Sequence, residues 1–492
     1  MAFQDATIQE IDQIMQEAWQ AFMVFRKSTL GQRAELMRAI ASEIDALGDT
    51  LIAKAMEETH LPEARLKGER ARTTGQLISY AAACEAGNWL EVRIDTAVPD
   101  KNMPDLRKMQ VPLGPVVVFG ASNFPFAYST AGGDTASAPA AGCPVVLKAH
   151  PAHAETSEMV AGAILKAVER SGMLRGVFAH VHGAGFDVGK ALVTHPTTKA
   201  VGFTGSFGGG KALFDWANQR KEPIPVFAEM GSINPVFLLP GKMKTSAKEV
   251  AHLYAGSITA DKGQFCTKPG LLVGLDNADL STFLQELAGE IEKVVPGTML
   301  HPGIAKAFVD KRKAALAQAH VTTVAVSATR PGEDEGLPTI ASVSASVFLK
   351  NPLLHQEVFG PYCLVILCAD KKEMLEIAKH LEGQLTATLM ATEADVVEYE
   401  ELAGEVMNIC GRMILNGVPT GVRVGLGMQH GGPYPATTDS RFTSVGADGI
   451  KRWVRPVSFQ NWTESLLPDP LKNANPLKIW RTVNDQLTKE PL

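Results

Sequence analysis

Short runs of β-branched residues alternate with helical segments along most of the chain, and this alternation constrains the fold most strongly. Helical stretches at 156–170 and 188–193 separate the first runs, which lie at Val116–Phe119, Val145–Leu147, Val177–Val181 and Ala200–Phe203. A strand, a helix and a second strand in succession form a βαβ unit, whose two strands are parallel. The sequence therefore predicts an α/β protein built on parallel sheets.

A second series of alternating segments begins near residue 232. Its members are Val236–Leu239, a helix around 247–260, Leu271–Gly274 and, later, Cys363–Leu367. The first 80 residues instead carry apolar side chains at helical spacing, such as Ile8, Ile11 and Met15. We expect two α/β domains, one of residues 1–92 and 110–230 and one of residues 231–454. Prolines and polar residues predict that 93–109 and 455–492 are bridging segments, the second an extended arm.

Composition excludes several classes of protein. Lys and Arg total 47 against 53 Asp and Glu, and no long basic run occurs, so we expect neither a nucleic acid nor an acidic membrane surface as partner. We find no secretory signal and no apolar stretch of about 18 residues, so we expect no membrane span. The six cysteines are scattered without zinc-finger spacing. We therefore expect a cytoplasmic protein without a metal site.

A glycine-rich segment from Val201 to Lys211 follows one of the predicted strands. Free N–H groups at the start of a helix can bind phosphate, so such a turn can hold a nucleotide. The P-loop pattern G-x-x-x-x-G-K-[ST] fits from Gly205 but fails at Ala212, where a hydroxyl for Mg²⁺ is required. A P-loop nucleotidase and a plain strand-to-helix turn are the two alternatives for this segment.

Seven segments, in order along the chain, resemble the motifs of the aldehyde dehydrogenase superfamily. They are Pro112–Phe126, Val145–Pro151, Phe203–Gly210, Glu229–Pro235, Gly263–Thr267, Glu357–Pro361 and Asn416–Gly421. The resemblance implies a Rossmann-like cofactor domain over 1–92 and 110–230, a catalytic domain over 231–454 and bridging or oligomerisation segments. It also implies NAD(P)-dependent oxidation of an aldehyde to an acid by a homodimer or homotetramer. A non-catalytic binding relative of the same fold is a further alternative.

Further phrases resemble an NADP-preferring branch of that family, which includes α-ketoglutaric semialdehyde (2,5-dioxopentanoate) dehydrogenases and a bacterial fatty aldehyde dehydrogenase. They are Phe119–Pro125, Ser129–Asp134, Lys148–Pro151 and Gln429–Thr437, and Glu69–Leu77 is similar to the semialdehyde subgroup. The resemblance implies oxidation of 2,5-dioxopentanoate to 2-oxoglutarate. A medium- or long-chain aliphatic aldehyde is the alternative substrate.

The same motifs imply three catalytic residues. Cys266 attacks the aldehyde carbon, giving a thiohemiacetal that becomes a thioester when hydride leaves. Asn123 donates its amide to the oxyanion, beside the Cys266 backbone N–H. Glu229, at the end of a predicted strand, activates the water that hydrolyses the thioester. These residues speak against the non-catalytic alternative.

The motifs also imply a cofactor site. NAD-preferring relatives often carry a glutamate three residues after the strand-end lysine, whereas Pro151 stands there in this chain. An acid would repel a 2′-phosphate, so its absence favours NADP, with NAD as the alternative. The residues expected to bind the cofactor are Lys148, His150, Gly205, Ser206, Gly210, Glu357 and Phe359.

An acid-bearing aldehyde needs a cation at the distal end of its site, and arginine fits a carboxylate best. Arg72 and Arg423 are the candidates. His430, in Gln-His-Gly-Gly, is a third candidate for the substrate site.

Overall fold

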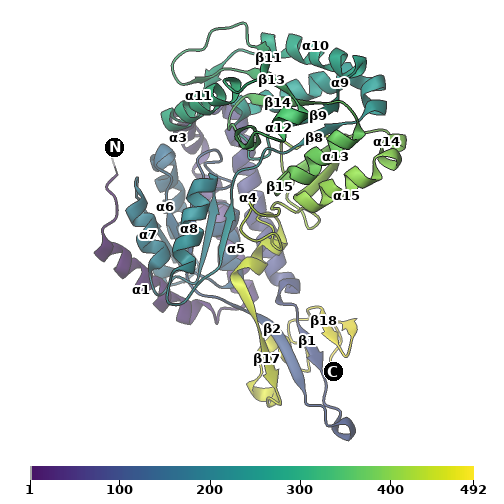
Figure 1. Cartoon of the computed structure of the whole chain (residues 1–492). Coiled ribbons are helices and arrows are strands. Elements are labelled where there is room, and N and C mark those ends of the chain that lie inside the picture. The colour runs from purple at the N-terminus through teal and green to yellow at the C-terminus, as the bar shows by residue number, and fades with distance from the viewer. Residues whose placement is uncertain (1–2) are drawn as a thin grey trace.

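A five-stranded parallel sheet forms the centre of the first half of the molecule (Figure 1). The computed structural model describes residues 3–492. The strand order is β5-β4-β3-β6-β7, and all neighbours are parallel. The strands are β3 (Val116–Phe119), β4 (Val145–Lys148), β5 (Phe178–Val181), β6 (Ala200–Thr204) and β7 (Val226–Glu229). The helices that follow them are α5 (Gly133–Ala141), α6 (Ala154–Arg170), α7 (Phe186–Thr194) and α8 (Phe207–Asn218). The four strands predicted between 116 and 203 are confirmed.

The direction of the chain reverses at the middle of this sheet. It runs outward from β3 through β4 to β5 and then returns across the sheet to β6 and β7. The connections that leave the carboxyl ends of β3 and β6 therefore turn to opposite sides and open a crevice, where α/β proteins commonly bind ligands.

A seven-stranded sheet forms the second half, in the order β11-β13-β14-β9-β8-β15-β16. Its pairs are parallel except β11 with β13. The strands are β8 (Val236–Leu238), β9 (Leu271–Leu275), β11 (Thr322–Val326), β13 (Thr339–Ser344), β14 (Tyr362–Cys368), β15 (Gln384–Met390) and β16 (Cys410–Leu415). A separate pair joins β10 (Gly297–Thr298) to β12 (Glu335–Gly336). The helices are α9 (Pro240–Thr259), α10 (Ala278–Lys293), α11 (Pro302–Leu316), α12 (Ala345–Phe348), α13 (Lys371–His380), α14 (Glu393–Glu398) and α15 (Glu400–Ile409).

Four helices precede the first sheet: α1 (Ile8–Phe25), α2 (Leu30–Ala46), α3 (Gly48–Thr59) and α4 (Glu63–Ala86). The α1 helix begins where Thr7 and Glu10 form a reciprocal capping box, and it buries Ile11 and Met15 one turn apart. Residues of α2 and α4 share one apolar core with β3 and β4, so these helices complete the first α/β unit.

An arm extends away from the two α/β units, with the C-terminus beside it (Figure 1). It is a sheet of β17 (Val454–Gln460), β2 (Leu106–Pro112), β1 (Arg93–Asp95), β18 (Arg481–Val483) and β19 (Gln486–Thr488). Segments from both predicted bridging regions thus pair with each other. The domain boundaries given above stay a prediction.

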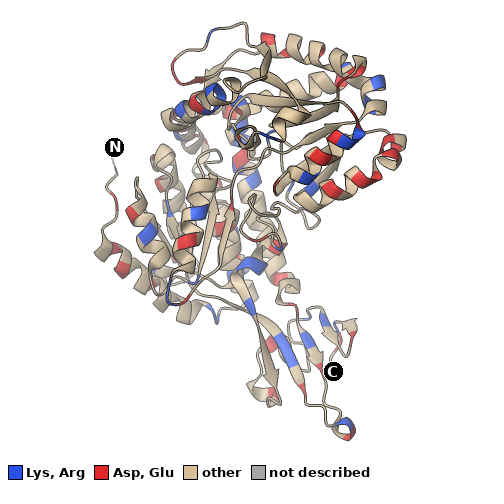
Figure 2. Ribbon diagram, in the orientation of Figure 1, with Lys and Arg blue, Asp and Glu red and all other residues tan. Residues whose placement is uncertain are grey.

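Charges of both signs are interspersed along the helices of the two units (Figure 2). Over residues 3–492, every helix is too short or too polar to cross a lipid bilayer.

Candidate active site

Cys266 lies in a loop whose backbone is packed directly against another loop. The preceding residues Asp261, Lys262 and Gly263 all have positive φ angles. A Cβ added to Gly263 would lie 2.4 Å from the carbonyl carbon and oxygen of Gly360. Glycine at 263 therefore lets the cysteine loop reach the 357–361 segment, which carries two predicted cofactor residues.

Three side chains from distant parts of the sequence meet at the sulfur. Glu229 is the last residue of β7, and its Oε2 lies 3.1 Å from His430 Nε2. The same His430 nitrogen lies 3.8 Å from Cys266 Sγ. One ligand-type atom from each of the three residues lies within 4.8 Å of the others. The predicted nucleophile and base are thus neighbours, and a buried imidazole lies beside both.

The electrostatics of this group favour a protonated thiol beside an ionised carboxylate. Burial, followed by the charge of Glu229, raises the pKa of the Cys266 thiol well above its usual 9.0. Burial opposes ionisation of Glu229, but His430, Cys266 and Ser444 outweigh it and lower the pKa of that carboxyl. The carboxylate is therefore ionised, and the Cys266 thiol hydrogen-bonds to it, so Glu229 is the acceptor nearest the thiol proton. Its Oε1 is buried without a hydrogen-bond partner in the described chain, which leaves a lone pair free.

Two asparagines hold the cysteine loop. Asn123 Nδ2 donates to the Gln264 carbonyl at 3.0 Å, which places the predicted oxyanion donor two residues from the cysteine along that loop. Asn234, fully buried, donates through its Nδ2 to the Cys266 carbonyl at 2.8 Å and to the Lys268 carbonyl at 3.0 Å. Asn234 is not among the residues predicted from the sequence, although it lies in the motif that begins at Glu229.

A cavity of about 410 Å³ opens beside the cysteine. Cys266, Glu229 and Asn123 line it at one end, and the predicted cofactor residues that line it are His150, Gly205, Ser206, Glu357 and Phe359. Ser206 is the N-cap of α8 and accepts a hydrogen bond from Gly209 N, so the cavity opens onto the start of that helix. Such a start suits a pyrophosphate, because its free N–H groups point at the anion.

Two predicted cofactor residues lie outside this lining. Lys148 ends β4, and burial lowers the pKa of its ammonium. Gly210 packs on Met230, since an added Cβ would lie 2.6 Å from the Met230 side chain. Lys211, the lysine of the P-loop pattern, donates to both carboxylate oxygens of Asp215 at 2.6 Å, so its ammonium is engaged within α8.

Glu357 is an acid with an unusual titration. Burial raises its pKa to about 7, although the charges of Lys268 and Lys311 oppose the shift. Lys268 is itself buried and donates to the carbonyls of Val358 and Tyr362, which anchors the segment carrying Glu357.

The two predicted substrate arginines differ in position. Arg72, on α4, donates to the Tyr128 hydroxyl at 3.3 Å, and Tyr128 packs near the His430 ring at a centroid distance of 5.9 Å. Neither arginine lines the cavity, and Arg423 is exposed.

A third arginine was missed. Arg412, on β16, acts electrostatically on Cys266 and Tyr128, while burial lowers its pKa. The signal available in the sequence was its position just before the 416–421 motif.

Comparisons with known proteins show which proteins this chain is similar to. The family model described as "Aldehyde dehydrogenase family" matches residues 1–448. The alpha-ketoglutaric semialdehyde dehydrogenase of Acinetobacter baylyi is 45% identical over 491 residues, covering 99% of this chain and 93% of the relative. Alpha-ketoglutaric semialdehyde dehydrogenase 2 of Azospirillum brasilense is 46% identical over 475 residues, with 96% and 90% covered.

Solved structures share the fold at lower identity. A 1-pyrroline-5-carboxylate dehydrogenase from Thermus with bound NAD superposes with a TM-score of 0.79 at 20% identity, over 93% of this chain and 86% of that one. A succinic semialdehyde dehydrogenase from Streptococcus pyogenes in complex with NADP⁺ gives 0.78 at 17% identity, over 93% and 96%.

Proposed function

Since the chain belongs to the aldehyde dehydrogenase family, we propose that it oxidises 2,5-dioxopentanoate to 2-oxoglutarate with NADP as the oxidant. The meeting of Cys266, Glu229 and His430 beside a cavity is the observation that carries this proposal. The names of the two semialdehyde dehydrogenases with 45% and 46% identity support the choice of substrate.

Attack on the aldehyde requires the thiol to lose its proton as the carbon–sulfur bond forms. A free thiolate is scarce because the thiol pKa is raised, so a base beside the sulfur must accept the proton. The Glu229 carboxylate, which hydrogen-bonds to the Cys266 thiol and lies 3.1 Å from His430 Nε2, is placed for this transfer. The Asn123 amide and the Cys266 N–H would stabilise the oxyanion of the thiohemiacetal.

Bound NADP supplies the hydride acceptor at this stage, and a thioester of Cys266 remains. Once Glu229 has released the thiol proton to solvent, its carboxylate takes a proton from water, whose oxygen attacks the thioester carbon. The carbon–sulfur bond breaks, the carboxylic acid leaves, and the sulfur becomes a thiol again with the proton taken from water. The unpaired Oε1 of Glu229 suits this second use of the carboxylate.

Several features support NADP as cofactor. The residues that line the cavity include the start of α8 for a pyrophosphate, and Glu357 and Phe359 for the nicotinamide end. Lys148 ends the strand beside β3, and Pro151 stands where an acid would repel a 2′-phosphate. His150 lines the same cavity.

A pair of arginines behind the catalytic residues suits the carboxylate of the substrate. In 2,5-dioxopentanoate, four carbon–carbon bonds of about 1.5 Å separate the aldehyde and carboxylate carbons, so they lie within about 6 Å of each other. A carboxylate on a substrate bound to Cys266 must therefore lie close to the catalytic group. Tyr128 accepts a hydrogen bond from Arg72 and interacts electrostatically with Arg412. Arg412 also interacts electrostatically with Cys266.

Both arginines keep donors for an anion. Arg72 Nη1 and Arg412 Nε are buried with no partner between residues 3 and 492. Carbonyls of Pro419 and Gly421 accept from the Nη atoms of Arg412 at 2.5 and 3.1 Å, which fixes the guanidinium. A buried donor without a partner is costly, and a carboxylate would satisfy both. We therefore assign Arg72 and Arg412, rather than Arg423, to the distal end of the substrate.

Substrate comparison tests this assignment. Arg72→Met and Arg412→Met should each lower kcat/KM for 2,5-dioxopentanoate by about 10- to 100-fold, the range for a lost charged hydrogen bond. Both should change kcat/KM for pentanal much less, because pentanal has no carboxylate. The exposed Arg423→Met is the matched control and should behave as wild type. Equal losses with both substrates would contradict the carboxylate role.

Testing the assigned aldehyde and cofactor requires kinetic measurements with several aldehydes and with both NADP and NAD. Wild-type protein should reduce NADP, followed at 340 nm, faster with 2,5-dioxopentanoate than with aliphatic aldehydes of medium or long chain. Higher kcat/KM with the aliphatic series would make those aldehydes the substrate class. Higher kcat/KM with NAD than with NADP would overturn the cofactor assignment alone.

The location and assembly are further parts of the proposal. All six cysteines are free thiols, which supports a reducing compartment such as the cytoplasm. The edge strand β16 exposes Met413 and Leu415, at 42% and 59%, which supports a homodimer or homotetramer. Light scattering of the purified protein tests the oligomer, and a monomer would contradict it.

A further inference from the structure

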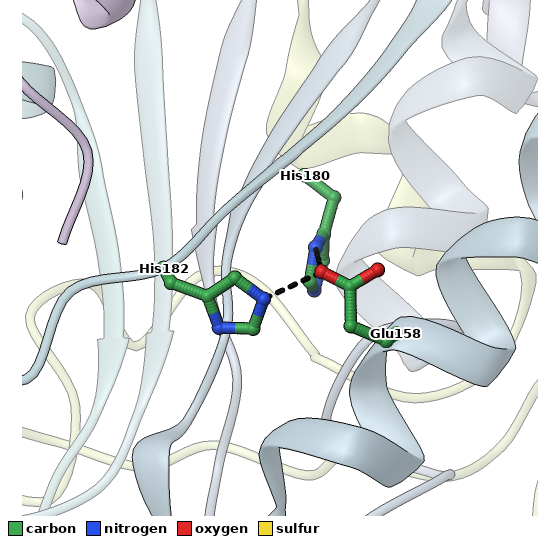
Figure 3. Close-up of side chains that lie close together, drawn as sticks. All are labelled: Glu158, His180 and His182. Atoms are coloured by element: carbon green, nitrogen blue, oxygen red, sulfur yellow. Dashed lines mark hydrogen bonds and ion pairs between the residues drawn. The ribbon is translucent and has the colours of Figure 1, made fainter. Parts of the chain in front are cut away.

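A group of two histidines and a glutamate lies at the outer edge of the first sheet, apart from the catalytic residues (Figure 3). His180 belongs to the edge strand β5, and His182 follows that strand directly. Residues two apart on a strand project on the same side. Glu158, on the neighbouring helix α6, points its carboxylate between the two rings (Figure 3).

The three side chains converge on one small volume. Glu158 Oε1 lies 2.5 Å from His182 Nε2 and 3.3 Å from His180 Nδ1. One ligand-type atom from each residue lies within 4.8 Å of the others. In a tetrahedral zinc site with bonds of about 2.1 Å, neighbouring ligand atoms are about 3.4 Å apart. Small side-chain shifts, largest for the 45% exposed Glu158, would produce that spacing.

Residues behind the group orient the more buried ring. Ser157 Oγ lies 2.8 Å from His180 Nε2 and 2.6 Å from Thr130 Oγ1. Such contacts to the outer nitrogen fix the orientation of a metal-binding imidazole. When Nε2–H donates to Ser157, the Nδ1 lone pair faces the Glu158 oxygen, and a cation between these two acceptors relieves their repulsion.

We propose that Glu158, His180 and His182 bind one divalent transition-metal ion, with zinc as the representative. Two imidazoles and one carboxylate form a ligand set that zinc accepts, and water completes the coordination where the site opens to solvent. The Glu158 carboxylate offsets one of the two positive charges of the ion, and each imidazole supplies one nitrogen lone pair.

The bound ion would connect three segments of the first α/β unit, namely α6, the end of β5 and the N-terminal segment. It joins α6 to the end of β5, and His182 also contacts the N-terminal segment through stacking with Phe3 and a hydrogen bond from Ala6 N to its carbonyl. An ion that binds only the folded protein stabilises it by mass action. Zinc should therefore raise the thermal midpoint of the protein without taking part in aldehyde oxidation.

Calorimetric titration of the full chain with zinc tests the site. The catalytic residues Glu229, Cys266 and His430 also lie close enough to hold a metal, so the titration uses a Cys266→Ala background. After chelator treatment, this protein should bind one zinc per chain, and its Tm should rise with zinc concentration. His182→Asn and Glu158→Gln should each weaken binding by at least about tenfold, since even residues that only orient ligands contribute 10- to 100-fold.

The matched control is His252→Asn. His252 is 80% exposed and pairs with Glu290, as an ordinary surface histidine–glutamate pair. It should leave zinc affinity and the shift in Tm unchanged. The proposal is overturned if His182→Asn and Glu158→Gln bind zinc as tightly as their Cys266→Ala parent, or if the parent binds none. Because no catalytic residue is involved, a failure here leaves the proposed aldehyde oxidation unaffected.

Discussion

Adding one methyl group at Gly263 should remove most of the activity while leaving the fold largely intact. In Gly263→Ala, the new Cβ would lie 2.4 Å from the backbone of Gly360, whereas ordinary contacts begin at 3.4 Å. The two loops must therefore separate by 1.0 Å or more. The φ of +65° adds about 1–2 kcal/mol of backbone strain, because alanine rarely adopts a left-handed conformation.

This displacement separates the groups that must react. One of the loops carries Cys266 and the other carries Glu357 and Phe359, which face the same cavity. A misplacement of about 1 Å typically costs about 10²-fold in rate. We expect kcat/KM for 2,5-dioxopentanoate, measured by NADPH absorbance at 340 nm, to fall by about 10²-fold.

A second glycine supplies the control. Gly289 lies within α10, and a Cβ there would meet nothing within 4 Å. Gly289→Ala should keep full activity and equal or higher stability, because alanine favours helix. If Gly263→Ala retains the wild-type kcat/KM, the close approach of the two loops does not position the nucleophile, and the reasoning fails.

Three further predictions concern the titrating residues. Glu229→Gln should lower both the rate of the NADPH burst and the steady-state turnover by about 10²–10⁴-fold, because the thiol and the hydrolytic water lose the same base; a burst at the wild-type rate would contradict the first of these two roles. The rate of inactivation by iodoacetamide should still be rising at pH 9, because the Cys266 pKa lies well above 9.0, and a plateau near neutral pH would indicate a free thiolate. Glu357 has a raised pKa in the folded protein, so its contribution to stability is full below its usual value of 4.5 and is lost as pH rises through about 7. Between pH 4.5 and 7, the Tm of wild type should therefore fall relative to the Tm of Glu357→Gln. Parallel curves of Tm against pH would refute the raised pKa of Glu357.

Local pattern was sufficient for the strands of the first sheet and for the motif residues. The runs at 116–119 and 145–147 became the central strands β3 and β4, because buried parallel strands require continuous apolar, β-branched residues. Cys266, Glu229 and Asn123 stood out because each lies in a recognisable segment. The sequence also indicated that Glu229 ends a strand, as it does in β7.

Only the tertiary structure decided which side chains meet. His430 is 164 residues from Cys266, yet their side chains lie 3.8 Å apart. Arg412 interacts electrostatically with Cys266, whereas Arg423, only eleven residues later, is exposed. The packing of two sheets and the course of the connecting loops determine such distances. Periodicity and motif spacing report the conformation of a segment and do not report what lies across from it.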